Sequence, residues 1–320
     1  MTKTITAICW AIVALALIGL AIWFLTGNIF GIQTDFGIVN YNSFGTGFYG
    51  GNHDKVYEYT VSAAGVKSLK IDWISGSITI TPYSGSEIQI TEYANRELAE
   101  NEQLVIRESG GTLVVDYCSK TRITSNMSKL LEIKVPSALA EKLVELGVDA
   151  TSADISLENL MMEKLYLNVI SGNINLADII AASARLDSTS GDFRLTAVNM
   201  DSISICTISG TTRAENSTFK KFDGDSTSGD FILEGSVTEL EISTISGGAK
   251  VTTSVVLEKV KCDTTSGDIA LFIPDTDSVS VRFDSLSGSL TGDIPMMLVN
   301  IGGYSFDSIS GGVTISRNAS

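Results

Sequence analysis

The sequence predicts an all-β protein, a parallel β-solenoid similar to a β-helix, with coils of about 19 residues and an N-terminal transmembrane helix. A Ser-Gly dipeptide recurs at nearly regular intervals, apolar and polar residues alternate on both sides of it, and an apolar stretch lies near the N-terminus. We expect four segments. They are a cytoplasmic tip and transmembrane anchor (1–30), a Gly/aromatic linker (31–55), an irregular N-terminal β-section (56–145) and regular solenoid repeats (146–320).

The N-terminal anchor is predicted from the almost wholly apolar run at positions 5–25. About 20 such residues in helical form span a bilayer core. Lys3 precedes the segment and the next basic residue is Lys55, so the positive-inside rule places the N-terminus in the cytoplasm. We therefore expect a single-pass protein of the cell membrane with an extracytoplasmic β-domain. A cleaved signal peptide is the alternative, but the sequence LTGNIFG after the apolar run offers no small-residue cleavage site.

The repeat is carried by Ser-Gly dipeptides at intervals of 19, 19, 19, 18, 20, 21 and 23 in the numbering. Their serines are Ser171, Ser190, Ser209, Ser228, Ser246, Ser266, Ser287 and Ser310. Ser152 extends the series backwards by one more interval of the same length as the first, with Ala153 in the glycine position. Such a period is typical of repeat architectures, in which each unit buries its apolar face only against its neighbours.

Within each unit, apolar residues alternate with polar ones before and after the dipeptide. Leu165 and Leu167 precede Ser171, for example, and Ile174 and Leu176 follow it. Alternation with period two indicates two short strands, and glycine permits the bend between them. The simplest arrangement is one unit per coil. A coil of two units, or about 38 residues, is the alternative, because some outward positions repeat only in every second unit.

Two further segments bear on the ends of the solenoid. Around Ser75 the apolar pattern matches the later units, although about four repeat periods separate it from Ser152, so we expect irregular coils between them, in an N-terminal β-section that caps the solenoid. The chain ends shortly after its last strand, around residues 313–315. This predicts an uncapped C-terminal coil, whose open edge invites self-association or docking of a partner.

Acidic residues form two columns on the outward side of every second unit. Three residues before the Ser, and two residues after it, stand Asp149, Asp154, Asp187, Asp192, Asp225, Asp230, Asp263 and Asp268. One interpretation is bend chemistry, in which these side chains bond local backbone groups and the alternation separates like charges. The other is a Ca²⁺ site, since calcium prefers several oxygen ligands. The eight residues are therefore candidate calcium ligands, and no other cofactor is predicted.

The composition argues against several function classes. With 37 acidic and 22 basic residues the formal net charge is −15, which opposes nucleic-acid binding. One histidine, His53, leaves little for His-dependent catalysis, and no unit has a distinctive carboxylate cluster, so we expect no enzyme. Cys206 and Cys262 lie three coils apart, about 14 Å along a regular stack, which is too far for a disulfide.

The anchor, the segment VKSLKIDWISGSITITPY (66–83), the segment LEIKVP (131–136) and the serial TSGD and ISG units resemble a bacterial family. This is the putative-adhesin family of β-strand-repeat proteins, known as domain of unknown function 4097. The resemblance covers roughly residues 56–320. It implies a membrane-anchored extracytoplasmic protein, and it supplies no catalytic or ligand residues.

We therefore expect a non-enzymatic adhesin or cell-envelope interaction module. Its partners would be the membrane, through the anchor, and cell-wall polymer or envelope proteins, through the solenoid. A regulatory or accessory partner of a cell-envelope stress-response system is the alternative, and a glycan-processing enzyme is a third hypothesis.

Overall fold

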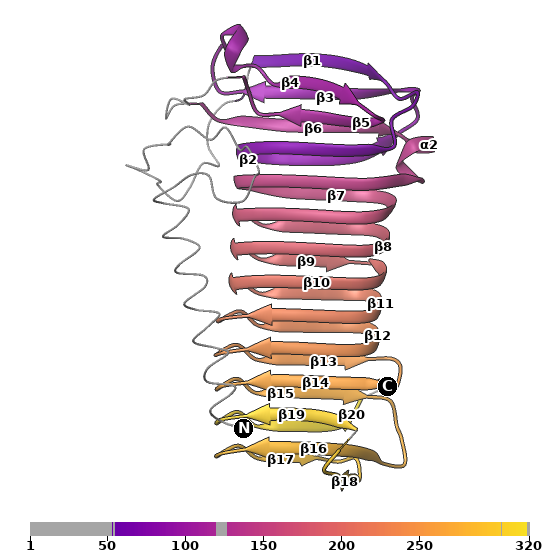
Figure 1. Cartoon of the computed structure of the whole chain (residues 1–320), viewed down its shortest axis with the longest axis vertical. Helices are drawn as coiled ribbons and strands as arrows, with labels where there is room; N and C mark the ends of the chain where they lie inside the picture. The colour runs from indigo at the N-terminus through magenta and orange to yellow at the C-terminus, as the bar shows by residue number, and fades with distance from the viewer. Residues whose placement is uncertain (1–52, 54, 120–126, 302, 319–320) are drawn as a thin grey trace. The chain divides into compact units, whose positions relative to one another are not determined.

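The computed structural model describes residues 53, 55–119, 127–301 and 303–318. These residues form a stack of strands arranged in two sheets that enclose the core (Figure 1). We call the strand segments that precede each Ser-Gly the first sheet, and those that follow it the second sheet. The predicted anchor lies outside the described residues. Among the residues that are described, no helix is long and apolar enough to cross a membrane.

The regular coils confirm one repeat unit per coil. Residues one repeat apart are parallel partners in adjacent coils, as Ile155 is with Ile174 and Leu165 with Ala184. The alternative of a two-unit coil is therefore wrong. The strands of this part are β7 (Leu143–Ser171), β8 (Ile174–Ser190), β9 (Phe193–Thr196), β10 (Asn199–Ser209), β11 (Thr212–Ser226), β12 (Phe231–Thr244) and β13 (Ala249–Thr253).

Each regular coil has a second bend, which returns the chain from the second sheet to the first. In four successive coils a non-glycine residue with φ between 52° and 54° stands there. These evenly spaced residues are Asn159, Asp178, Ala197 and Asn216. The left-handed conformation turns the chain without interrupting the inter-coil hydrogen bonds on either side. The sequence does not reveal this bend, because the four residues are of three types, Asn, Asp and Ala.

The N-terminal part begins with a coil in the predicted register. Strand β2 (Ser68–Tyr83) contains Ser75-Gly76 and pairs directly with β7, Ser75 with Ser152 and Ile78 with Ile155. The expectation of irregular coils between them is wrong, because the described residues 84–119 and 127–142 lie on the other side of β2. They form β3 (Glu87–Ala94), η1 (Glu100–Glu102), β4 (Val105–Ser109), β5 (Thr112–Asp116), β6 (Lys129–Pro136) and α2 (Ser137–Ala140).

Antiparallel strands close this end of the stack. β5 and β6 run parallel to β2, one in each sheet. Beyond them β4 pairs antiparallel with β5, and β3 pairs antiparallel with both β6 and β1 (Lys55–Ser62). We call strands β1 and β3–β6 the N-terminal cap. The parallel repeat therefore ends where the strand direction changes. The coil of β2 is covered by β5 in the first sheet and by β6 in the second sheet.

At the other end, the order of the coils differs from the order of the chain. The strands are β14 (Lys259–Thr264), β15 (Ile269–Ile273), β16 (Val279–Ser285), β17 (Leu290–Gly292), β18 (Met296–Leu298), β19 (Tyr304–Ser308) and β20 (Val313–Arg317). β19 pairs with both β14 and β16, and β20 pairs with both β15 and β17 (Figure 1). The C-terminal coil therefore lies inside the stack. The prediction that it is uncapped is wrong, and the outermost coil is formed by β16 and β17.

The core follows the predicted alternation. Leu146, Val148, Ile155 and Leu157 are all at most 1% exposed, and the same pattern continues along the stack. One departure from it has a packing reason. Gly224 occupies an inward position where a β-carbon would lie 2.7 Å from the ring of Phe231, so the small residue makes room for the large one.

The cysteines agree with the coil model. Cys206 and Cys262 are not joined to each other by a disulfide. Cys262 is buried in the core, where burial raises the pKa of its thiol, and Cys206 lies on the outward side of the first sheet.

Candidate binding face of the first sheet

The outward side of the first sheet carries the first predicted acidic column. Residues at equal positions in successive coils lie side by side and form rows across the strands. The row three residues before the Ser contains, in spatial order, Asp116, Asp72, Asp149, Asn168, Asp187, Cys206, Asp225, Ser243, Asp263, Asp307 and Asp284. We call it the carboxylate row.

In the middle of the carboxylate row, uncharged residues separate the acids as the sequence predicts. Asn168 donates a side-chain hydrogen bond to Asp149 over 3.3 Å, and Arg185 forms an ion pair with Asp187 over 2.7 Å. Cys206 stands between Asp187 and Asp225. These carboxylates are therefore paired or separated by the strands between them.

At both ends of the row, three aspartates occupy adjacent strands. At the N-terminal end they are Asp116, Asp72 and Asp149. At the other end they are Asp263, Asp307 and Asp284. Sequence analysis missed Asp72, Asp284 and Asp307, although each lies three residues before a Ser-Gly dipeptide. Asp307 lies beside Asp263 because the coil of β19 and β20 stands between the coil of β14 and β15 and the coil of β16 and β17. No sequence signal reveals this order of coils.

Basic residues partly neutralise the C-terminal group of aspartates. Arg282 donates two hydrogen bonds to the carboxylate of Asp307, over 3.0 and 3.2 Å. Lys261 contacts Asp263 over 3.3 Å and Glu241 over 2.7 Å. Burial raises the pKa of the Asp263 carboxyl, while Lys261 opposes that rise. The hydrogen bond to Glu241 in turn raises the pKa of Lys261.

The second acidic column bonds the backbone at the start of the second sheet. In each case the carboxylate accepts a backbone N–H from the equivalent position of an adjacent coil. The pairs are Asp154 with Asn173 (2.7 Å), Asp192 with Thr211 (2.7 Å), Asp230 with Gly248 (2.7 Å) and Asp268 with Gly312 (2.8 Å). Asn173 accepts from Asp192 N–H in the same way over 3.0 Å. This column therefore performs the bend chemistry that the sequence suggested.

The calcium hypothesis gains no support from this geometry. In the ranges that the structure describes, no three acidic, histidine or cysteine side chains lie close enough together to hold a metal ion. Each carboxylate of the second column already uses one oxygen on a backbone N–H. Calcium binding by the eight aspartates stays a prediction.

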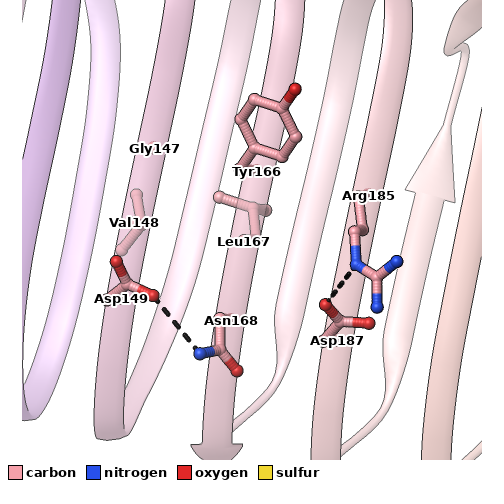
Figure 2. Close-up of a pocket in the computed structure, with 8 residues that line it drawn as sticks. All are labelled: Gly147, Val148, Asp149, Tyr166, Leu167, Asn168, Arg185 and Asp187. Atoms are coloured by element: carbon pink, nitrogen blue, oxygen red, sulfur yellow. Dashed lines mark hydrogen bonds and ion pairs between the residues drawn. The ribbon is translucent and has the colours of Figure 1, made fainter. Parts of the chain in front are cut away.

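The carboxylate row borders a shallow hollow on the face of the first sheet. Its lining residues come from three successive coils and are Gly147, Val148, Asp149, Tyr166, Leu167, Asn168, Arg185 and Asp187. Figure 2 shows two polar pairs that flank Tyr166 and Leu167, Asp149 with Asn168 on one side and Arg185 with Asp187 on the other. The Tyr166 side chain is 42% exposed.

A buried ion pair lies in the N-terminal cap, and sequence analysis missed it. Lys129 and Glu92 are fully buried, with 2.6 Å between Nζ and Oε1. The Lys129 ammonium also lies over the ring of Tyr117 and donates to the carbonyl oxygen of that residue. Burial raises the pKa of Glu92 and lowers that of Lys129, and each charge opposes the shift of the other.

The sequence did hold a signal for half of this pair, because Glu92 shares the inward side of β3 with Ile88 and Ile90. A buried pair of this kind is strongly destabilising when one partner is removed. Because neither side chain is exposed to a ligand in solution, we assign the pair a structural role in the cap.

The two sheets, the repeated coil and the antiparallel cap define a β-solenoid of the repeat-protein class. A family model described as Toastrack DUF4097 matches residues 66–299. The chain therefore belongs to that family, as its repeated Ser-Gly units predicted.

Solved structures of similar proteins support the fold. A putative adhesin from Parabacteroides distasonis has 14% identity and a TM-score of 0.52, over 82% of this chain and 98% of its own. A putative lipid binding protein from the same species has 16% identity and a TM-score of 0.52, over 82% of this chain and 96% of its own. No protein of curated function matches the chain.

Proposed function

We propose that this chain is a non-enzymatic, membrane-anchored adhesin or cell-envelope interaction module. The observation that carries the proposal is the outward side of the first sheet. There, successive coils present mainly polar side chains in rows at a strand spacing of about 4.8 Å, with Tyr166 among them. Such a surface suits a partner that is itself extended or repetitive. One of the similar solved structures is called a putative adhesin, which agrees with this role.

The location belongs to the same proposal. Residues 5–25 are the anchor, the N-terminus is cytoplasmic, and the solenoid is extracytoplasmic. The charge of −15 keeps the solenoid away from anionic polymers and favours a neutral or cationic partner surface.

Self-association is a further part of the proposal, now assigned to the coil of β16 and β17. The outer edge of β17 has no strand partner among the described residues. Leu286, Met297, Leu298 and Ile301, in or next to this coil, are between 56% and 92% exposed. An open edge with apolar side chains is best covered by a strand, and a second copy of the chain supplies one. A chain that stays monomeric in sedimentation velocity at high concentration would contradict this.

The proposed function is tested by sedimentation of the full chain, kept soluble in detergent, with purified cell-wall sacculi. The measurement is made with calcium and with a chelator. Binding in both conditions supports the adhesion role. Binding that is lost in chelator adds support for calcium at the aspartate columns. No binding in either condition contradicts the role and favours a regulatory partner of an envelope stress-response system, tested next by retrieval of membrane partners through the anchor.

A further inference from the structure

Gly147 has no structural reason to be a glycine. It lies inside β7, where glycine is less favourable than residues with a side chain. A β-carbon built on Gly147 would meet no atom within 4 Å, and Gly147 is not among the glycines with a positive φ. Among the strand glycines of the described ranges it is the one with neither constraint. The others, Gly76, Gly224, Gly235 and Gly292, would each place a β-carbon within 3.0 Å of another atom.

The missing side chain opens the hollow described above. Gly147 pairs with Lys70 of β2 on one side, and Tyr166 lines the same hollow one coil further along. One position without a side chain therefore separates Lys70 from Tyr166. With adjacent strands about 4.8 Å apart, the backbones that carry Lys70 and Tyr166 are about 10 Å apart, and their side chains border a gap over Gly147. We call this gap the Gly147 slot.

The groups around the Gly147 slot suit a neutral polyhydroxylated ligand. Tyr166 supplies a flat, apolar ring with a polar tip. Two residues further along the strands stand the amide of Asn168 and the carboxylate of Asp149, which are planar donors and acceptors. Asp187 forms an ion pair with Arg185 at 2.7 Å, and the carboxylate of Asp149 in the same lining disfavours an anionic ligand.

Other ligand classes fit less well. An acyl chain would remove water from Asp149, Asn168 and Arg185 and could not satisfy the hydrogen-bonding groups that their mutual contacts leave over, which is costly. A phosphate would lie close to the carboxylates of Asp149 and Asp187. A pyranose ring has one face of C–H groups for Tyr166 and equatorial hydroxyls for the planar polar groups.

We propose that the Gly147 slot binds one sugar ring of a neutral glycan, with the ring against Tyr166 and its hydroxyls toward Asp149 and Asn168. This inference deepens the proposed adhesion role and rests on it. It assigns a reason to Gly147, because a side chain there would occupy the place of the sugar.

The test uses isothermal titration of the full chain with two neutral linear probes, cellohexaose and chitohexaose, in a detergent without a sugar headgroup. We expect at least one probe to bind. Gly147→Phe places a ring in the slot on a β-carbon that meets no atom within 4 Å, and it should weaken binding at least about tenfold, which corresponds to about 1.4 kcal/mol. Tyr166→Ala should weaken it similarly, whereas Tyr166→Phe should keep most of it.

The matched control is Ser156→Phe, which adds an exposed ring to the same coil on the outward side of the second sheet and should leave binding unchanged. Thermal unfolding of each variant checks the fold. Gly147→Phe is expected to be at least as stable as the parent chain, because it removes a glycine from a strand.

Failure of this inference is distinct from failure of the adhesion role. If neither hexaose binds, or if Gly147→Phe binds as the parent does, the Gly147 slot is not a sugar site. If sacculi still bind the Gly147→Phe variant normally, adhesion stands and uses another part of the face. If the hexaoses bind and sacculi do not, the Gly147 slot stands as a sugar site, and the adhesion role is contradicted.

Discussion

The same Ser-Gly dipeptide forms different bends in two regions of the stack. In the upper region, from β7 to β10, the glycines have φ between 134° and 144°. There the N–H of Gly172 and of Gly191 donates to a serine carbonyl oxygen of the next coil. In the lower region the glycine N–H donates instead to a hydroxyl three residues earlier in its own coil. These pairs are Gly229 with Ser226, Gly247 with Thr244, Gly267 with Thr264, Gly288 with Ser285 and Gly311 with Ser308.

This difference explains why only the upper region repeats strictly. A bend whose glycine bonds to the next coil requires that coil to present its carbonyl at the same place, and there the spacing of the serines is constant. A bend closed within its own coil makes no such demand. In the lower region the serine intervals are 18, 20, 21 and 23, and the coil of β19 and β20 lies between coils that precede it in the chain. We infer that a bend closed within its own coil permits both the unequal serine intervals and the placement of the coil of β19 and β20 between earlier coils.

The largest effect is expected from a β-carbon at an upper bend. Gly191→Ala would place that carbon 2.0 Å from the carbonyl oxygen of Gly172, on a backbone with φ of 144°. Because both the contact and the conformation are unfavourable, we expect a loss of about 3 kcal/mol or more in the free energy of unfolding. Urea unfolding measures it. Gly147→Ala is the control and should be neutral or slightly stabilising; equal losses in the two variants would contradict this account.

The sequence predicted the part of the fold that depends on regular spacing. The serines from Ser152 to Ser228 are evenly spaced, so coil length, inward positions and strand direction all followed from alternation. The position of the last coil did not follow, because Val281 and Phe283 have the same pattern as Tyr304 and Phe306, and either coil fits beside β14. The pattern of apolar residues does not distinguish them.

The candidate site was predictable only in part. The acidic columns were visible in the sequence because their offset from Ser-Gly is constant. The Gly147 slot was not, because a glycine with no steric constraint is recognised only when the atoms around its absent side chain are known. The buried Lys129 was unpredictable for a different reason, because its partner Glu92 lies on a strand much earlier in the chain.

A medium effect is expected from removing one hydroxyl in each region. Ser226 and Ser188 occupy the same position in their coils, and both are 8% exposed. Ser226→Ala removes the acceptor of the buried Gly229 N–H, which lies 2.6 Å from it, and should cost about 1–3 kcal/mol. The Ser188 hydroxyl is buried without a hydrogen-bond partner, so Ser188→Ala should be neutral or stabilising. A similar loss in both variants, measured by urea unfolding, would show that these hydroxyls act through packing alone.

The smallest effect concerns the carboxylate row, where its N-terminal end differs from its middle. Burial, and then the adjacent carboxylates of Asp149 and Asp116, raise the pKa of Asp72, while Lys70 opposes the rise. A raised pKa means that the contribution of Asp72 to stability is fully present below its unfolded value of 3.8 and is lost as the pH rises through the folded value.

Asp72→Asn should therefore be more stable than the parent chain at pH 7, by roughly 0.5–1 kcal/mol or a few degrees in Tm. The advantage should disappear at a pH of about 3, where Asp72 is mostly protonated in both the folded and the unfolded chain. Asp187→Asn tests the middle of the row. It removes the partner of Arg185 and should bring no gain at pH 7. Thermal unfolding at the two pH values gives both comparisons. If Asp72→Asn gains nothing at pH 7, water screens the adjacent carboxylates, and the uncharged residues in the middle of the row are not needed to separate charge.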